Sequence, residues 1–304
     1  MIKSLSICIP VYNWNINQLV EDLIDQCKDT SLEFEILVYD DYSLAQYKEQ
    51  NQEIRNHYCV QYKELAQNIG RSKIRNLLAS DAQFETLLFL DCDVTPRDKN
   101  FIVTYINNSN CESFVIQGGL THSPTKDKIN CLRWLYGTQK EEIPAERRQK
   151  QPYKSFKTSN FLITKSLFFI IKFDEDLKGY GHEDTFFGYE LKKIQQVIKH
   201  INNPVIHHGL ETSKEFIVKT EQGLINLASI YLQHKTDNNL IEDIKILHFI
   251  KNNKTLSEIF YKKWKVMKAF YLKNLLSNSP SLRFFDFYKL GFLIDQIKLQ
   301  EISK

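Results

Sequence analysis

Two aspartates that flank a single residue, Asp91 and Asp93, have the spacing with the clearest chemistry in this sequence. They follow the apolar run Thr86–Leu90 directly. Two carboxylates placed in this way can turn toward one divalent cation, and Mg²⁺ and Mn²⁺ prefer oxygen ligands that they often share with a substrate's phosphates. The alternative is a turn in which one aspartate caps a helix near Asp98, since aspartates are common in turns. Because the pair ends what reads as a buried strand, we expect it to bind a metal ion.

A second acidic pair, Asp40 and Asp41, follows the apolar run Glu35–Tyr39. An aspartate at the end of a strand can accept a hydrogen bond from an N–H group of a nucleotide base, and this contact discriminates among nucleotides. It can equally cap the helix that we expect to begin near Leu44, with Ser43 or Asp41 as the cap. The sequence alone leaves both interpretations open.

The segment Asn68–Asn76 contains a glycine that is followed by a cation. Gly70 can form a tight turn, and Arg71 at the N-terminus of the next helix would suit an anion. Arg75 lies one turn further along, on the same helix face. An ordinary solvated helix face is the alternative, and for Lys73 we favour it.

The segment Gly179–Asp184 has glycines on both sides of Tyr180. Glycines let the backbone approach a sugar that packs on the aromatic ring, and a carboxylate nearby can deprotonate an acceptor hydroxyl. Glu183 and Asp184 are also favoured in the first turn of a helix, because negative charge interacts well with a helix N-terminus. Spacing alone does not separate catalysis from helix capping.

Two adjacent histidines, His207 and His208, follow a short apolar segment. Imidazole is a common metal ligand, although a lone histidine is more often a core or surface residue. In a chain that already offers two acidic ligands, a histidine at a strand end is a candidate third ligand. Neighbouring side chains on a strand point to opposite faces, so we expect one of the two to reach the metal and favour His207.

The elements that must position these residues alternate along the first part of the chain. Short apolar runs, typical of strands buried on both faces, alternate with segments of helical spacing, and this pattern predicts right-handed βαβ units and a mostly parallel sheet. The predicted strands are Leu5–Ile9, Glu35–Tyr39, Val60–Tyr62 and Thr86–Leu90, and the predicted helices are Ile16–Cys27, roughly Leu44–Asn56 and Arg71–Ser80. Sheets of this kind bind ligands at the carboxyl ends of their strands. The candidate residues that follow the strands should therefore share one edge.

Beyond Phe114 the pattern is looser. We predict further strands at Phe114–Gln117, Thr158–Ile163 and Val197–His200, and a helix at Asp184–Lys193. The polar, proline-containing stretch Thr121–Lys157 reads as a mobile loop or lid. Past about Leu210 the chain is helical and rich in lysine. We therefore predict an α/β domain over residues 1–210, with helices flanking its sheet, and a helical C-terminal extension over residues 211–304.

The composition excludes several classes of protein. A formal charge of +3 over 304 residues is too small to imply nucleic-acid binding. The six cysteines form no CxxC pair and lack the close spacing of a disulfide framework, so we expect free thiols and a cytoplasmic setting, with the inner face of the membrane as an alternative. No apolar run approaches the roughly 18 residues of a membrane-spanning helix, and the apolar start of the chain is too short for a signal sequence.

The order of these motifs resembles that of a known enzyme family. ICIPVYN, VYDDYS, NIGRSKIRN and LLFLDCDV, in this order, resemble the inverting family 2 glycosyltransferases, which have the Rossmann-like GT-A fold. GYGHED and the histidine near NPVIHHG resemble the branch that includes chondroitin-polymerase-like enzymes and the C-terminal half of β-1,4-galactosyltransferases. The resemblance covers roughly residues 4–210, and the combination of five motifs in order is specific where no single motif is.

The resemblance implies roles for the residues near the nucleotide. Pro10 and Tyr12 would line the nucleotide pocket, and Asp41 would face the uracil of a UDP-sugar. Arg71 would lie near the nucleotide. Asp91 would approach the ribose or the metal-bound diphosphate.

The resemblance also implies a metal site and a catalytic base. Asp93 would be the main ligand of Mn²⁺ or Mg²⁺, with Asp91 beside it and His207 completing the site. Asp184 would be the base, and Glu183 would position the acceptor.

The implied reaction moves a hexosyl or N-acetylhexosaminyl group from a UDP-sugar to a hydroxyl of a glycan or lipid-linked acceptor, in the synthesis of surface polysaccharide or glycoconjugates. Two residues depart from the family pattern. The related branch often has tryptophan where this chain has Tyr180, which puts the donor or acceptor preference in doubt. Cys92 is an unusual residue between the two aspartates, and we expect it to leave metal binding unaltered.

Two other functions compete with this one. A sugar-phosphate nucleotidylyltransferase would need a glycine-rich loop bearing arginine and lysine directly after the first strand, and the sequence PVYNWN contains no glycine. A non-catalytic sugar-nucleotide-binding protein would have lost residues of the metal site or the base, and all of them are present.

The C-terminal segment carries an aromatic and apolar stripe at helical spacing, interleaved with lysines. The stripe consists of Phe260, Trp264, Met267, Phe270, Tyr271 and Leu275, and the lysines are Lys262, Lys263, Lys265 and Lys268. Basic amphipathic helices can lie on an anionic membrane. More often such a stripe packs against its own domain or a second subunit, which is the interpretation we favour. Peripheral membrane contact or homo-oligomer contact through these helices stays open.

Overall fold

The computed structural model describes residues 2–109, 114–123, 131–177 and 181–302. It divides into two compact units. The first, which we call the sheet unit, consists of Met1–Ser123, Lys140–Asp176 and Glu183–Gly209. The second, the helical unit, consists of Pro124–Gln139, Leu177–His182 and Leu210–Lys304.

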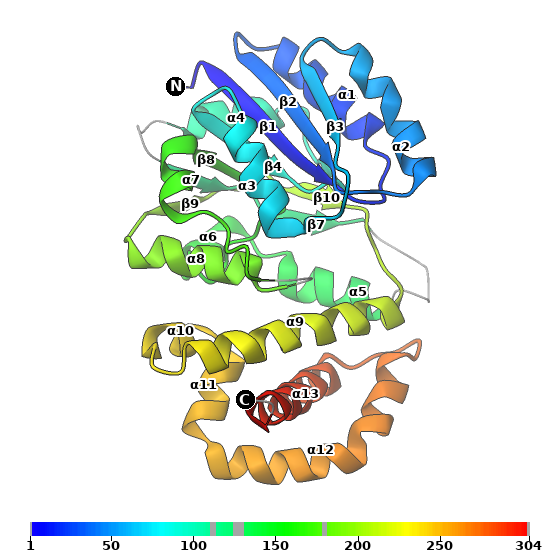
Figure 1. The fold of residues 1–304 in the computed structure, drawn as a ribbon, viewed down its shortest axis with the longest axis vertical. Helices are drawn as coiled ribbons and strands as arrows, with labels where there is room; N and C mark the ends of the chain where they lie inside the picture. Colours follow the sequence, from blue (N-terminus) through cyan, green and yellow to red (C-terminus); the bar gives the residue numbers. More distant parts are fainter. Residues whose placement is uncertain (1, 110–113, 124–130, 178–180, 303–304) are drawn as a thin grey trace. The chain divides into compact units, whose positions relative to one another are not determined.

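The sheet unit is built on a seven-stranded sheet (Figure 1). Its strands, in spatial order, are β3 (Val60–Glu64), β2 (Glu33–Asp40), β1 (Ser4–Val11), β4 (Thr86–Leu90), β8 (Asn160–Thr164), β6 (Val115–Gln117) and β9 (Ile198–His200). Strand β8 is antiparallel to both of its neighbours, and the other paired strands are parallel. The predicted α/β fold with a mostly parallel sheet is therefore confirmed.

Helices cover both faces of this sheet. They are α1 (Asn17–Lys28), α2 (Ala45–Asn51), the short 3₁₀-helix η1 (Gln52–Asn56), α3 (Arg71–Asp81), α4 (Phe101–Asn108), α6 (Ala145–Gln149), α7 (Lys165–Ile171) and α8 (Glu183–Lys193). Helices α1 and α4 contribute to one buried cluster, and α3, α7 and α8 contribute to the other.

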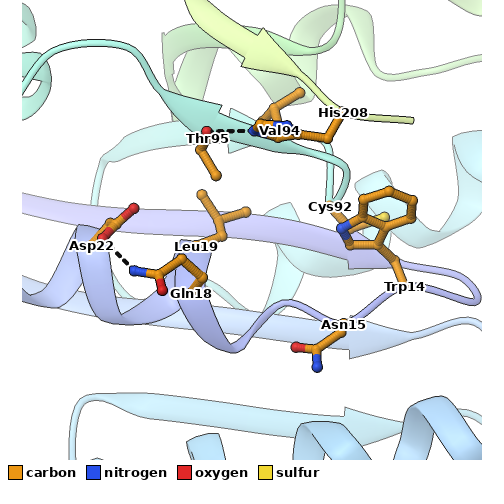
Figure 2. A pocket seen from close by; sticks show the side chains of 9 residues that line it. All are labelled: Trp14, Asn15, Gln18, Leu19, Asp22, Cys92, Val94, Thr95 and His208. Carbon is orange, nitrogen blue, oxygen red and sulfur yellow. Dashed lines mark hydrogen bonds between the residues drawn. The ribbon is translucent and has the colours of Figure 1, made fainter. Parts of the chain in front are cut away.

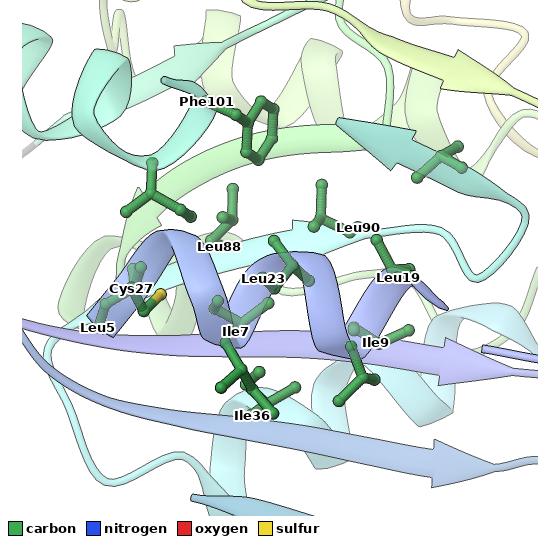
Figure 3. Close-up of a cluster of buried hydrophobic side chains, with 14 of the residues drawn as sticks. Leu5, Ile7, Ile9, Leu19, Leu23, Cys27, Ile36, Leu88, Leu90 and Phe101 are labelled. Atoms are coloured by element: carbon green, nitrogen blue, oxygen red, sulfur yellow. The ribbon is translucent and has the colours of Figure 1, made fainter. Parts of the chain in front are cut away.

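Side chains alternate between these two clusters along each central strand. On β1, Ile7 and Ile9 belong to the cluster under α1, and Cys8 belongs to the opposite one. Figure 3 shows Leu19 and Leu23 of α1 among the side chains of the first cluster. Because successive residues of a strand point to opposite faces, a strand that is buried on both sides must be apolar throughout. This explains the continuous apolar runs in the sequence.

A second, three-stranded sheet was not predicted. It consists of β5 (Val94–Pro96), β10 (Val205–His207) and β7 (Leu120–His122), with β10 in the middle. Strand β10 pairs antiparallel with β5 so that His207 lies opposite Val94, and parallel with β7 so that His207 lies opposite His122. Since Val94 directly follows Asp93, this register fixes how the predicted acidic turn and the predicted histidine meet.

The prediction of a mobile loop over Thr121–Lys157 is wrong for the described part of that stretch. Residues 131–149 contain α5 (Cys131–Tyr136), the π-helix η2 (Gly137–Glu141) and α6. The buried guanidinium of Arg148 donates hydrogen bonds to the backbone carbonyls of Gln117, Gly118 and Ile201. From the sequence alone an arginine is expected to lie in solvent. Here Arg148 is buried and fixes α6 to the sheet, because its N–H groups find acceptors in backbone carbonyls from distant parts of the chain.

The helical unit contains α5 and five further helices, α9 (Ser213–Gln233), α10 (Asn238–Asp243), α11 (Lys245–Asn252), α12 (Lys254–Leu275) and α13 (Leu282–Ile302). Helix α13 packs against both α9 and α12 (Figure 1). A capping box between Thr212 and Glu215 starts α9. The predicted helical C-terminal region is therefore confirmed. Within the part of the chain that the structure describes, no helix has the length and apolarity needed to cross a bilayer.

The predicted stripe on α12 divides between the core and the surface. Trp264, Tyr271 and Leu275 are buried, as we favoured. Met267 and Phe270 are exposed in the single chain, so the part of the prediction that concerns a second subunit stays open for them. The ring of Phe270 nevertheless contacts that of Phe284 on α13, with 5.4 Å between centroids.

The close approach of α12 and α13 depends on a glycine. A Cβ atom on Gly291 of α13 would overlap the indole ring of Trp264. We expect Gly291→Ala to lower the free energy of unfolding by about 1–3 kcal/mol, because added volume in a packed core forces its neighbours to move. Urea unfolding followed by tryptophan fluorescence measures this, with Lys262→Ala on the exposed side of α12 as the control. Stability equal to that of the wild type would contradict the packing described here.

Candidate active site

Asp93 and His207 form a partly buried pair at the junction of the acidic turn and the second sheet. The Nε2 atom of His207 lies 3.2 Å from Oδ2 of Asp93. The backbone N–H of His208 donates to the carbonyl oxygen of Asp93 at 2.8 Å, which joins the two segments beside the pair. Two of the three predicted metal ligands therefore lie together, although they are more than a hundred residues apart in the chain.

The surroundings keep Asp93 ionised. Burial alone would raise the pKa of Asp93, but the hydrogen bond and the charge of His207, with the charge of Arg71, outweigh it and lower the pKa to about 2. Nδ1 of His207 is buried and has no hydrogen-bond partner among the described residues. A carboxylate oxygen and an imidazole nitrogen are donors that suit Mn²⁺, so these two residues fit the metal that we predicted.

Asp91 has a different partner. Its Oδ1 accepts a hydrogen bond of 2.6 Å from Nη2 of Arg75, whose side chain is only 2% exposed. The described residues contain no group of three histidine, cysteine or acidic side chains arranged to hold a metal. Of the three predicted metal ligands, Asp93 and His207 contact each other. Asp91, the third, contacts Arg75 instead.

The thiol of Cys92 lies between the two aspartates. Burial, assisted by the charge of Asp93, raises the pKa of the Cys92 thiol to about 12.

Asp41 braces the turn that precedes α3. Its two carboxylate oxygens accept the backbone N–H groups of Ile69 at 2.6 Å and Gly70 at 3.0 Å. Burial raises the pKa of Asp41, and these two hydrogen bonds oppose that rise. Gly70 has a φ of 86°, a conformation that glycine adopts readily. The alternative role of Asp41 as a cap for α2 is wrong, because the residue at that N-cap is Leu44.

Two exposed tyrosines lie at the carboxyl edge of the first two strands. Tyr12 follows β1 and is 55% exposed, and Tyr42 follows β2 and is 56% exposed. The loops that carry them are joined, since Asn13 N–H donates to Oγ of Ser43 at 2.8 Å. Tyr42 was not predicted to belong to the site. Pro10 lies one residue inside β1 and is partly exposed.

The two predicted acidic residues of α8 are each paired with a cation. Oε1 of Glu183 lies 3.4 Å from Nη1 of Arg71, and Oδ2 of Asp184 lies 2.6 Å from Nζ of Lys157. Arg71 therefore links the start of α3 to the start of α8, and its charge also acts on Asp93. The contact of Lys157 with Asp184 was not predicted, because the two residues are twenty-seven positions apart and no local sequence pattern indicates that they pair. Gly179 and Tyr180 lie outside the described residues.

Two further residues support the Asp93–His207 pair. The ring of His122 packs edge-to-face against that of His207, with 5.4 Å between centroids. Its two nitrogens each lie 3.2 Å from a carboxylate oxygen, of Glu141 and of Glu142. A Cβ atom on Gly209 would overlap the carboxylate of Asp93. Neither residue was predicted, because both depend on the register of the small sheet.

A pocket lies beside the acidic turn (Figure 2). It has a volume of about 430 Å³ and is lined by Trp14, Asn15, Gln18, Leu19, Asp22, Cys92, Val94, Thr95 and His208. Nε2 of His208 lies 2.7 Å from Oγ1 of Thr95. The two adjacent histidines thus have different partners, as the alternation along a strand predicts.

The comparison with protein families identifies the class of the chain. The family described as Glycosyl transferase family 2 matches residues 6–171, which run from β1 to the end of α7. With a fold of the GT-A type, the chain belongs to glycosyl transferase family 2 and is a glycosyltransferase. Glu183, Asp184 and His207 lie beyond the matched residues. None of the curated proteins shows significant similarity to the chain.

Solved structures with a similar fold include a mannosyltransferase and the protein TarS. The mannosyltransferase PcManGT from Pyrobaculum calidifontis, in complex with GDP-Man and Mn²⁺, has a TM-score of 0.59 and 10% identity, with 99% of this chain and 87% of that chain covered. S. aureus TarS 1-349 in complex with UDP-GlcNAc has a TM-score of 0.51 and 17% identity, with 99% and 91% covered. At these identities the likeness is one of fold.

We expect the Asp93–His207 pair to appear in the acid stability of the protein. Because the pKa of Asp93 is lowered from an ordinary value of 3.8 to about 2, its ionised form stabilises the fold fully above pH 3.8, and this contribution is lost as the pH falls toward 2. Wild type and Asp93→Asn should therefore differ most in unfolding free energy above that range and converge below it. A difference that does not change between these pH values would contradict the assignment.

Gly209→Ala should impair sugar transfer without unfolding the protein. The new methyl group displaces the carboxylate of Asp93, and a displacement of about 1 Å in an active site can reduce activity by about 10²-fold. Steady-state transfer assays measure the loss, and circular dichroism controls for folding. Full activity would show that the position of Asp93 does not matter.

Proposed function

We propose that the protein is a metal-dependent, inverting glycosyltransferase that uses a UDP-sugar donor and a hydroxyl acceptor on a glycan or a lipid-linked glycan. The single observation that carries the proposal is the Asp93–His207 pair, which combines an ionised carboxylate with an imidazole beside the carboxyl edge of the sheet. The synthesis of surface polysaccharide or glycoconjugates is the setting that we propose. We assign this chemistry to residues 1–210 and regard residues 211–304 as an appended region.

In this proposal Asp93 and His207 hold Mn²⁺ or Mg²⁺ through a carboxylate oxygen and a ring nitrogen. When bound, the metal neutralises the charge that develops on the departing diphosphate. Arg75 holds the carboxylate of Asp91 in place through their 2.6 Å contact, so that in this proposal Asp91 faces the ribose or the diphosphate of the donor as a second carboxylate. Phosphate oxygens of the donor would supply further oxygen ligands, as is common for such sites.

The proposed nucleotide site lies along the ends of β1 and β2. Tyr12 offers an exposed ring on which a base can stack, and Pro10 lies beside it at the end of β1. Each oxygen of Asp41 accepts one backbone N–H, but a carboxylate has about four lone-pair sites. Asp41 can therefore accept a further hydrogen bond from the N–H of uracil while it holds the turn before α3. Arg71, at the start of α3, adds positive charge on the nucleotide side.

We assign the catalytic base to Asp184. Its Oδ2 atom lies 2.6 Å from Nζ of Lys157, and this contact holds the carboxylate in place at the start of α8, where it can accept a proton. Asp184 takes the proton from the acceptor hydroxyl, the hydroxyl oxygen attacks the anomeric carbon from the face opposite the nucleoside diphosphate, and the configuration inverts. Glu183, held by Arg71 at 3.4 Å, positions the acceptor.

Replacement of the base tests the reaction. We expect Asp184→Asn to reduce transfer by about 10²–10⁴-fold, the usual contribution of general-base catalysis, and to leave UDP binding unchanged. Glu190→Gln, on the same helix and paired on the surface with Lys193, is the matched control and should keep its activity. An Asn variant that transfers sugar at the wild-type rate would exclude Asp184 as the base.

The adjacent histidines provide a matched pair of variants for the metal. His207→Ala should weaken Mn²⁺ binding in the presence of UDP by at least about tenfold, which is in the range of a lost contact at a metal site. His208→Ala should leave the affinity unchanged, because its ring contacts Thr95. Isothermal titration calorimetry measures both. The reverse order of effects would assign the metal to His208 and contradict our choice.

Turnover separates this proposal from the two alternatives. Given Mn²⁺ and a UDP-sugar, a glycosyltransferase releases UDP by transfer or by slow hydrolysis. Given UTP and a sugar phosphate, a nucleotidylyltransferase releases pyrophosphate. A binding protein releases neither product. A thermal-shift panel of UDP-sugars and GDP-mannose with Mn²⁺ then identifies the donor, since a bound ligand stabilises the fold.

A further inference from the structure

Helix α12 has a second face on which large apolar side chains stay exposed within the helical unit. Its inward face packs on α13 through Trp264 and Tyr271, which are buried. On the outward face five large apolar side chains are exposed, with Val266 at 82% and Phe270 at 51%. The five are Leu256, Ile259, Val266, Met267 and Phe270. We call these five residues, with Phe287 of α13, the outer face of the helical unit.

The outer face extends onto α13. Phe287 is also exposed, and its ring lies 5.9 Å from that of Phe260 and 6.2 Å from that of Tyr271. Phe270 in turn packs against Phe284, with 5.4 Å between ring centroids. The exposed rings are thus held in place from below by buried or half-buried rings, so they do not need to fold back on binding a partner.

The charge around the outer face is strongly positive. Helix α12 carries six lysines, and its single acidic residue, Glu258, is paired with Lys298 of α13 at 2.6 Å. Lys262, Lys263, Lys265 and Lys273 are exposed. At helical spacing Lys263 lies among the apolar residues Ile259, Val266 and Phe270. Lys262 and Lys273 lie in one row with Val266 at the edge of this apolar group. On α13, the acidic Asp286 next to Phe287 is paired with Lys289 at 2.9 Å.

We propose that the outer face binds an anionic lipid surface. Its apolar side chains can enter the boundary between headgroups and acyl chains, as those of interfacial helices do. Its lysines can lie along that boundary with their aliphatic stems on the apolar region and their ammonium groups among the lipid phosphates. Both features of the face, exposed apolar groups and excess positive charge, are then satisfied by the same partner.

A second copy of the chain fits the outer face less well. In a two-fold symmetric contact the same patch meets itself, so the lysine rows of α12 would be brought together while the nearest carboxylates, Glu258 and Asp286, already have lysine partners. Like charges at close range oppose such a contact. An anionic bilayer adds opposite charge instead.

Vesicle flotation of the full chain tests this proposal independently of catalysis. We expect binding to vesicles of phosphatidylcholine with added phosphatidylglycerol at low salt, and loss of binding both in high salt and with phosphatidylcholine alone. Screening by salt acts on the lysines. Absence of binding at low salt, or equal binding to both kinds of vesicle, overturns the proposal and leaves the proposed enzyme function untouched.

Two sets of variants locate the contact. Lys262→Glu with Lys273→Glu, and separately Val266→Ser with Phe270→Ser, should each reduce binding by at least about tenfold, since each lysine near the surface contributes measurably. All four positions are exposed, and circular dichroism controls for folding. Lys99→Glu with Lys150→Glu on the sheet unit changes the net charge by the same amount and should leave binding intact. Equal loss in this control means a non-specific charge effect and overturns the proposal. Analytical ultracentrifugation gives a further test. A wild-type dimer that the Val266→Ser and Phe270→Ser changes abolish would show that the outer face binds a second copy, and this would also overturn the proposal.

Discussion

The contact between the carboxylate of Asp93 and the imidazole of His207 is the interaction on which the proposed chemistry of this protein depends. A partly buried carboxylate is unfavourable unless a partner compensates it, and here the imidazole supplies a hydrogen bond. The pair requires a fixed register between β5 and β10, the small size of Gly209 beside the carboxylate, and the packing of His122 against the imidazole. Several otherwise ordinary residues thus serve to keep two side chains about 3.2 Å apart.

The other acidic residues of the site are separated from one another by cations. Arg75 binds Asp91, Arg71 binds Glu183, and Lys157 binds Asp184. Each of these three carboxylates therefore has one basic partner within 3.4 Å. The three basic side chains also bring positive charge to the site, which suits a substrate that carries negative charge.

The central sheet could be predicted from the sequence because its strands are buried on both faces. The runs Leu5–Ile9 and Thr86–Leu90 are apolar except for Ser6 and Thr86, and their observed bounds agree with the prediction to within two residues. Helix α3 was predicted for a similar reason, since Ile74 and Leu78 repeat at helical spacing and both are buried.

The three-stranded sheet could not be predicted in this way. Its strands have three residues each, and Leu120–His122 alone does not read as a strand. Their pairing joins β10 to β5 and β7, which lie far from it in the chain, and no local pattern encodes such a pairing. Arg148 and Lys157 are similar cases, because their partners come from distant parts of the chain. The types of the site residues were therefore readable, whereas their partners were not.

Anomalous scattering from manganese in crystals grown with UDP and Mn²⁺ tests the central claim most directly. The account predicts one manganese peak within coordination distance of a carboxylate oxygen of Asp93 and a ring nitrogen of His207, with diphosphate oxygens completing its shell. Density for UDP without manganese at this pair, or manganese bound at another place on the sheet unit, would contradict it.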